Sequence, residues 1–217
     1  FDPLTNDLNV QVTILKAGRP IPADATLVII PGSKSTTNDL QFMKDQGWDI
    51  DLFGHYRRGG HILGICGGYQ MLGTKISDPE GIEGPTGTID GLSLLDVNTI
   101  MTSQKSLTQV RAIYADEKTE IDGYEIHIGN TSGPDCRRPF AYIGARSEGA
   151  QNFDGRVKGT YLHGLFSDDG FRNLYLKNLG IDAGQVNYEA TVEDTLNVLA
   201  NHLEKHLNID QMVSMSR

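Results

Sequence analysis

Short apolar runs separated by turn residues predict strands that alternate with helices in the first third of the chain. The alternation of apolar and polar residues over 10–15 predicts a strand with one exposed face. Residues 25–30 and 61–65 are largely apolar runs, which are typical of buried strands in a parallel sheet. Between them, 36–46 and 49–58 are predicted to be helices, the second ended by two glycines. This alternation favours an α/β fold with a parallel sheet covered on both faces.

The pattern changes after Asp78, where glycines become frequent and short strand candidates replace helices. Four further strands are predicted, over 108–113, 123–128, 140–147 and 157–162. Helical spacing returns over 171–179 and 193–207, with Val192, Leu196, Leu199 and Leu203 on one face of the last helix. The chain is therefore expected to end in amphipathic helices.

A glycine-rich turn around Cys66 joins the predicted strand over 61–65 to a helix predicted over 68–73. The cysteine has glycine two residues before it and two residues after it, at Gly64 and Gly68. This spacing matches a nucleophile elbow with sulfur in place of the serine oxygen. At the N-terminus of a helix, the dipole and the free N–H groups would lower the pKa of the thiol. We therefore predict that Cys66 is a nucleophile rather than an inert core cysteine.

A nucleophilic cysteine needs a base, and His163 is the best placed of the six histidines. It ends a predicted strand and precedes a glycine, and the carboxyl ends of parallel strands are where α/β proteins place catalytic loops. Glu125 and His127 lie on one face of another predicted strand. They could form a polar face of the sheet, make a structural hydrogen bond or belong to the site. His202 and His206 are four residues apart, which fits a solvated helix face better than a metal site, and no metal is expected.

The loop Pro31-Gly32-Ser33-Lys34 follows the first buried strand. It is too short for a phosphate-binding P-loop. Backbone N–H groups of Gly32 or Ser33, together with that of Gly67, could form an oxyanion hole. A plain turn between strand and helix explains the local sequence equally well.

Composition narrows the class of protein. The 217 residues carry a formal net charge of -9 and contain no basic run, which argues against a nucleic-acid partner. No apolar segment approaches the roughly 20 residues that cross a bilayer, and no signal peptide is recognisable, so no membrane partner is expected. The two cysteines form no metal-binding motif, and a reduced, cytoplasmic protein is the simplest interpretation.

The motifs together resemble a known family. Gly64-Ile65-Cys66-x-Gly68-x-Gln70 is similar to the nucleophile motif of class I (triad) glutamine amidotransferases. That resemblance implies a flavodoxin-like three-layer α/β domain with a mostly parallel central sheet. More narrowly, four segments in order resemble the C-terminal glutaminase domain of the cobyric acid synthase family, in the cobalamin pathway. They are 27–36, 64–73 with 78–84, 123–129 and 159–166.

The resemblance implies a reaction and roles for particular residues. Cys66 would attack the side-chain amide of L-glutamine, and Gln70 would help to bind this substrate. His163 would keep the thiol ionised, protonate the leaving ammonia and then activate water. Tyr124 and His127 belong to a shared segment and are expected at the substrate site.

The resemblance also implies domains and partners. A glutaminase domain is expected over 1–182, with 183–217 as a helical extension packed on or beside it. Ammonia would pass to an N-terminal synthetase domain of the same polypeptide, which amidates carboxylates of a corrinoid. ATP and Mg²⁺ are expected in that synthetase domain and no cofactor in this one. The start at Phe1, without methionine, is interpreted as a domain of a longer chain.

Two further positions need comment, one that departs from the family pattern and one that is a weak candidate for substrate binding. Most triad glutaminases carry a glutamate two residues after the catalytic histidine, but Leu165 stands there. The cobalamin branch lacks this glutamate, so we expect a dyad whose imidazole is oriented by a backbone carbonyl, or by Glu125 or His127. Arg111 is a candidate for binding the α-carboxylate of glutamine, since arginine recognises carboxylates through two hydrogen bonds.

Two other functions remain open at this stage. A glutaminase subunit that serves a peptidoglycan-precursor amidotransferase would carry a similar elbow. A module of the same fold without catalysis could use its acidic surface to dock a partner.

Overall fold

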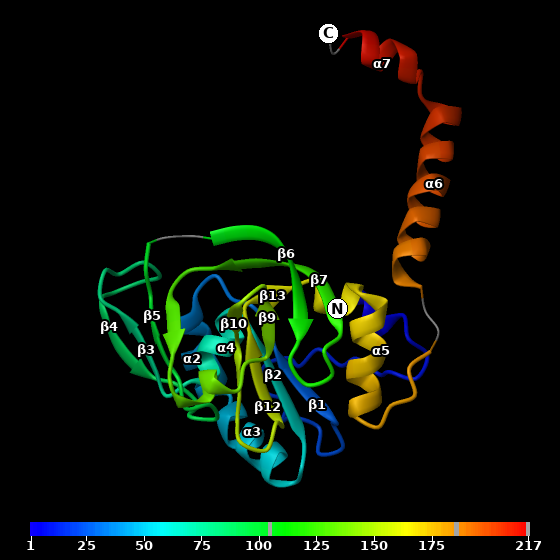
Figure 1. The fold of residues 1–217 in the computed structure, drawn as a ribbon. Helices are drawn as coiled ribbons and strands as arrows, with labels where there is room; N and C mark the ends of the chain where they lie inside the picture. The colour runs from blue at the N-terminus through cyan, green and yellow to red at the C-terminus, as the bar shows by residue number, and fades with distance from the viewer. Residues whose placement is uncertain (104–105, 185–186, 216–217) are drawn as a thin grey trace.

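A four-stranded sheet lies at the centre of the molecule (Figure 1). The computed structural model describes the chain except residues 104–105, 185–186 and 216–217. The sheet order is β1 (Leu27–Ile30), β2 (His61–Ile65), β12 (Val157–Thr160) and β11 (Ala150–Gln151). β1 and β12 pair with β2 in parallel, and β11 closes the edge in the antiparallel direction. The C-terminal ends of the parallel strands therefore meet at one edge of the sheet, where ligands bind in open α/β folds.

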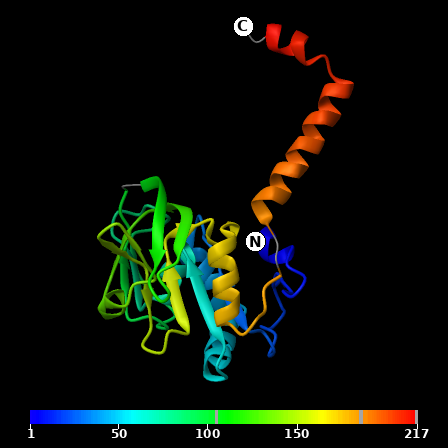
Figure 2. The same cartoon turned by 45° about the vertical axis from the view of Figure 1, so that its right-hand side comes forward.

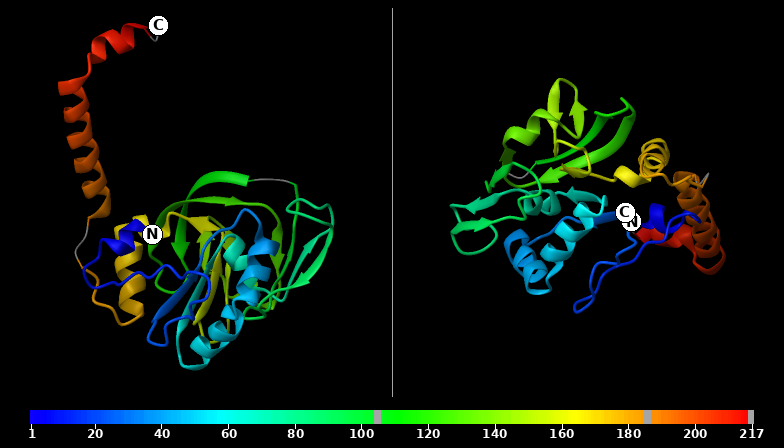
Figure 3. Two further views of the ribbon diagram at one scale, coloured as in Figure 1. Left: turned by 180° about the vertical axis from the view of Figure 1, so that it is seen from behind. Right: turned by 90° about the horizontal axis from the view of Figure 1, so that it is seen from below.

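Helices cover both faces of this sheet because β2 is apolar on both sides. Ile62 packs into a core with side chains of α2 (Thr36–Asp45), α3 (Trp48–Arg57) and α4 (Gly67–Leu72). Leu63 and Ile65 point into a second core, which includes the aromatic residues Phe171 and Tyr175 of α5 (Asp169–Asn178). The three-layer α/β arrangement is visible from behind and from below (Figure 3). It confirms the predicted fold class.

Two further sheets are mostly antiparallel. One has the order β10 (Arg146–Glu148), β9 (Ala141–Ile143), β6 (Ser106–Tyr114), β7 (Glu120–His127), β13 (Leu162–His163). The other has the order β4 (Gly87–Asp90), β3 (Lys75–Asp78), β5 (Asn98–Ile100), β8 (Asn130–Ser132), with β3 and β5 parallel. The remaining short elements are α1 (Asp2–Thr5), η1 (Pro134–Arg137) and η2 (Leu165–Ser167). The chain passes from β12 to β13 within two residues, and this change of sheet brings His163 beside β7.

Three strand predictions need correction. Residues 10–15 pair with no strand, and Ile14 is left 84% exposed, so apolar alternation here does not mark a sheet position. The strand predicted over 140–147 is a hairpin, β9 and β10, because Gly144 adopts a left-handed conformation with φ of 59°. The strand predicted over 157–162 is divided between two sheets, as β12 and β13.

The C-terminal extension forms α6 (Tyr188–His206) and α7 (Ile209–Met215). These helices extend away from the body of the molecule in Figures 1 and 2 and in the left view of Figure 3. No residue of α6 is buried. The expectation that 183–217 packs on or beside the domain stays a prediction. None of the helices in the described residues is both long enough and apolar enough to span a membrane.

Candidate active site

Cys66 occupies a strained turn between β2 and α4. Its φ of 54° and ψ of -113° are unusual for a residue with a side chain, and such strain concentrates at functional sites. The flanking glycines make room for the turn. A Cβ at Gly68 would lie 2.0 Å from the carbonyl oxygen of Ile30, and one at Gly64 would lie 2.6 Å from that of Gly68. The turn has the geometry of a nucleophile elbow.

This crowding predicts a large loss of stability for Gly68→Ala. The new methyl group would meet the backbone of β1, which cannot move without breaking the central sheet. We expect the free energy of unfolding to fall by about 2–3 kcal/mol, measured by urea denaturation. Gly84→Ala is the control, because a Cβ there meets no atom within 4 Å. A Gly68→Ala protein as stable as the control would contradict this account of the elbow.

The thiol of Cys66 donates a hydrogen bond to the carbonyl oxygen of Ile126, with a sulfur–oxygen distance of 3.3 Å. Burial raises the pKa of the Cys66 thiol, and the negative charge of Glu83 raises it further. A hydrogen bond from the N–H of Gly67 opposes this shift without reversing it. The prediction of a lowered thiol pKa is therefore wrong for this structure. The helix α4 is short, and desolvation of the thiol outweighs the hydrogen bond at the start of this helix.

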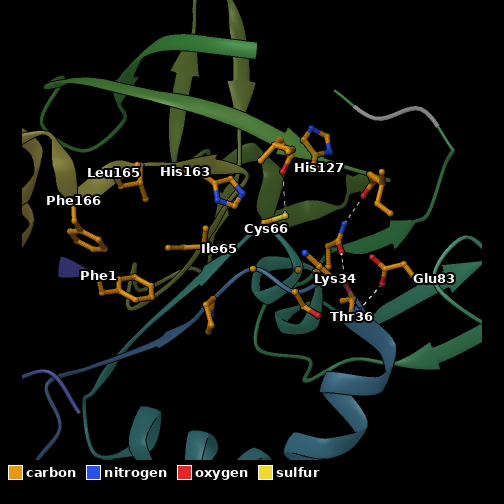
Figure 4. Close-up of a pocket in the computed structure, with 18 of the residues that line it drawn as sticks. Phe1, Lys34, Thr36, Ile65, Cys66, Glu83, His127, His163, Leu165 and Phe166 are labelled. Carbon is orange, nitrogen blue, oxygen red and sulfur yellow. Dashed lines mark hydrogen bonds between the residues drawn. The ribbon is translucent and has the colours of Figure 1, made fainter. Parts of the chain in front are cut away.

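The imidazole of His163 lies above Cys66 (Figure 4). The two side chains meet at Gly32, where a Cβ would lie 3.4 Å from Cε1 of His163 and 3.5 Å from Cβ of Cys66. The ring stacks on Tyr124 at a centroid distance of 5.1 Å. Among the described residues, the buried Nε2 of His163 has no hydrogen-bond partner. Burial lowers the pKa of His163, which keeps the ring neutral and Nε2 able to accept a proton.

The backbone carbonyl of Ile126 lies close to the ring of His163 and opposes the fall in the pKa of this histidine. It is a candidate for the orienting role of the missing glutamate. The same carbonyl accepts a hydrogen bond from the thiol of Cys66, so it lies beside both side chains. Leu165 lines the pocket with an apolar side chain. The structure therefore favours a backbone carbonyl among the orienting groups considered.

Glu125 is occupied elsewhere. Its carboxylate accepts hydrogen bonds from Nε2 of His127 at 3.3 Å and from Arg146 at 2.6 Å. These contacts, His127 first, hold the pKa of Glu125 below its ordinary value although burial opposes them. Nδ1 of His127 lies 3.1 Å from the carbonyl oxygen of Gly129, and its ring stacks on Tyr161 at 3.9 Å. This network fixes the end of β7, and with it the carbonyl of Ile126.

Backbone groups suitable for an oxyanion hole converge beside the thiol. The loop after β1 lies against the start of α4, since a Cβ at Gly67 would be 2.9 Å from the backbone nitrogen of Ser33. The hydroxyl of Ser33 is held by Asp39 and accepts the N–H of Ser35 at 2.8 Å. The structure brings Gly32, Ser33 and Gly67 to one place. Their role as oxyanion donors stays a prediction.

A cavity of about 760 Å³ opens in front of the dyad. Gln70 and His127 line it, together with Lys34, Thr36 and Glu83, which the sequence analysis did not select (Figure 4). The cavity has room for a free amino acid with space to spare.

Gln70 forms part of the cavity wall. Its amide nitrogen donates to the carbonyl oxygen of Ile128 at 2.8 Å and to the hydroxyl of Tyr161 at 3.1 Å. Its amide oxygen accepts from Thr36 at 3.4 Å, and the residue is 2% exposed. The side chain therefore joins α4 to the chain that follows β7 while it borders the cavity.

Arg111 and Tyr124 do not line the cavity. The guanidinium of Arg111 pairs with Asp122 across the sheet at 2.9 Å, and its side chain is 66% exposed. The expectation that Arg111 binds the substrate carboxylate is thus corrected, because its strand position directs it to solvent. Tyr124 stacks on the ring of His163.

Comparisons with known proteins agree with this geometry. Residues 1–171 match the model of the CobB/CobQ-like glutamine amidotransferase domain. The chain is 57% identical over 215 residues to the cobyric acid synthase of Jannaschia sp. (strain CCS1), covering 99% of the chain and 44% of that protein. It is 56% identical over 217 residues to a cobyric acid synthase of Rhodobacter capsulatus, covering 100% of the chain and 45% of that protein.

The chain therefore spans less than half the length of these curated relatives. Among solved structures, PurLQS from Thermotoga maritima shares the fold, with a TM-score of 0.59 and 19% identity over 82% of this chain and 90% of that one. The family match extends over most of the chain and includes the elbow, the dyad and the cavity that they border. The chain belongs to the CobB/CobQ-like glutamine amidotransferase domain family.

Proposed function

We propose that Cys66 and His163 hydrolyse L-glutamine and that the ammonia serves the amidation of corrin-ring carboxylates in cobyric acid synthesis. The observation that supports this most strongly is the strained elbow, which presents Cys66 and His163 at one point of a cavity. The relatives that cover the whole chain are cobyric acid synthases. Their additional length would hold the synthetase domain, where ATP, Mg²⁺ and the corrinoid would bind.

The reaction begins when the thiol of Cys66, which donates a hydrogen bond to the carbonyl of Ile126 in the resting site, transfers its proton from Sγ to Nε2 of His163. The thiolate attacks the side-chain amide carbon of glutamine, and the N–H groups of Gly67 and of Gly32 or Ser33 stabilise the oxyanion. His163 then gives the proton to the leaving nitrogen, which departs as ammonia. Water attacks the resulting thioester with His163 as base, glutamate is released, and the thiol regains its proton.

The cavity carries opposite charges that suit the two ends of a free amino acid. The carboxylate of Glu83 accepts the N–H of Thr36 at 2.7 Å and would bind the α-ammonium group of glutamine. Lys34 has an exposed side chain on the same cavity and would attract the α-carboxylate. Glutamine would then reach the dyad with its side chain first.

Glu83→Gln is accordingly expected to raise the KM for glutamine and to lower kcat/KM by about 10–100-fold. A hydrogen bond to a charged group contributes roughly 1.5–3 kcal/mol, which corresponds to this range. Steady-state assays of glutamate release measure the effect. Arg111→Gln is the matched control, because that side chain lies outside the cavity. Equal kinetics for the two variants would contradict the placement of the ammonium group at Glu83.

The proposed function is tested by assaying glutamate release and amide formation in a full-length polypeptide that carries this chain. Formation of corrinoid amides from glutamine, lost when Cys66 is replaced, is the expected result. Amidation of a peptidoglycan precursor in place of a corrinoid would support the alternative acceptor. Absence of glutamine hydrolysis with either acceptor would support a docking module without catalysis.

A further inference from the structure

The helix α6 leaves an apolar stripe uncovered. Val192, Leu196, Leu199 and Leu203 follow one another at intervals of four, three and four residues, which places them on one face. Leu196 and Leu199 are each 51% exposed, whereas the leucines Leu40 of α2 and Leu52 of α3 are fully buried. The adjoining α7 adds exposed apolar side chains at Ile209 and Met212. Helical stability in proteins comes mainly from packing of such a face, so this stripe requires a partner.

The base of this extension is fixed beside the N-terminal segment. Gly184 donates its N–H to the carboxylate of Asp7 at 2.9 Å. The side chain of Asn9 donates to the carbonyl oxygen of Asp182 at 2.7 Å. The N-terminus and the start of α6 therefore lie side by side (Figure 2). Any polypeptide that precedes residue 1 would enter next to the extension.

Two alignments differ in how they treat the extension. The domain family matches residues 1–171 and stops before α6. The cobyric acid synthase relatives match 99–100% of the chain, and this domain is the C-terminal part of their longer polypeptides. The extension is thus shared with proteins that have a second part and is outside the region common to the domain family. This distribution favours a partner within the longer polypeptide.

The charges beside the stripe indicate what that partner offers. Glu189, Glu193 and Glu204 lie along one long side of the apolar stripe, as their helical spacing places them. A complementary surface would be an apolar groove with basic residues on the corresponding rim. A membrane surface is disfavoured, because helices that lie on membranes carry lysine and arginine on the polar face. A coiled coil with a second copy is disfavoured, because the stripe spans about two heptads and such coils need three or four.

We propose that α6 and α7 form a docking arm that packs into an apolar, basic-rimmed groove of the polypeptide preceding this domain in the cobyric acid synthase relatives. This inference relies on the domain arrangement of the proposed function. The arm would connect the glutaminase to the part of the protein that uses its ammonia. The preceding polypeptide and the arm both leave the domain at the same place. The groove therefore meets the arm at a high effective concentration.

Hydrogen–deuterium exchange over residues 188–206 tests the docking arm. We expect fast exchange in the 217-residue chain alone and exchange at least tenfold slower in a full-length polypeptide that carries it. The double variant Leu196→Asp, Leu199→Asp should restore fast exchange in the full-length protein. The control Asn197→Asp, Asn201→Asp adds the same charges on the opposite face and should leave exchange slow.

Three results would overturn the docking arm. One is equal exchange in the isolated chain and the full-length protein. Another is protection of the isolated chain that grows with its concentration, which would indicate a second copy. The third is protection of the isolated chain at every concentration, which would indicate packing on its own domain. Hydrogen exchange does not require catalysis. A full-length protein that protects residues 188–206 but does not hydrolyse glutamine would therefore reject the proposed function and leave the docking arm intact.

Discussion

Cys66→Ala is expected to abolish glutamine hydrolysis, with a fall in kcat of at least about 10⁴-fold, as for removal of other covalent nucleophiles. The reason is that Cys66 supplies the sulfur at the elbow, and alanine leaves no atom that can form the thioester. Amidation with added ammonia should continue in a full-length protein, since that reaction needs only the synthetase. Glutamate release and amide formation are measured separately for each nitrogen source.

Cys136→Ala is the matched control for this experiment. Cys136 lies outside the catalytic cavity, with its sulfur 3.8 Å from the hydroxyl of Tyr69. Burial raises the pKa of this thiol as well, so the two cysteines differ chiefly in position. We expect the control to release glutamate within about twofold of the unmodified rate. Comparable rates from Cys66→Ala would remove the chemical basis of the proposed function.

His163→Gln is expected to lower kcat by about 10²–10⁴-fold, the usual contribution of a positioned acid–base group. Glutamine fills a similar space but cannot take the thiol proton or protonate the leaving ammonia. Cys66 would keep its proton at neutral pH, because burial raises the pKa of its thiol. Single-turnover assays that separate thioester formation from its hydrolysis should show both steps slowed.

The pH profile gives this variant a specific signature. A base acts in its neutral form, so kcat/KM of the unmodified protein should rise with pH through the pKa of His163. Burial lowers that pKa, which places the rise below the roughly 6.5 of an ordinary histidine. The variant should lose this acidic limb. A variant that keeps the same limb would show that another group accepts the proton.

Local sequence carries much of this site. The elbow follows from glycines at Gly64 and Gly68, since the steric demands of the turn act within a few residues. The place of His163 follows from the end of a strand next to glycine, and the structure brings it to Cys66 as expected. Both positions depend on short-range geometry, which spacing along the chain records.

Other features depend on contacts between distant segments. The carbonyl of Ile126 lies beside both Cys66 and His163, but every residue has a carbonyl and side-chain identity does not mark it. The raised pKa of Cys66 depends on how deeply the elbow is buried, which no local motif specifies. Glu83 belongs to a segment that the family resemblance includes, yet its position on the cavity depends on a loop after β3. The error at Arg111 has the same origin, since the facing Asp122 lies on another strand.

The most direct test of the central claim is to identify the residue that a diazoketone analogue of glutamine alkylates. Peptide mass spectrometry after reaction in a full-length polypeptide that carries this chain should place the adduct on Cys66, and excess L-glutamine should prevent it. An adduct on Cys136, or labelling of Cys66 that glutamine does not slow, would contradict the claim that Cys66 attacks the amide of glutamine.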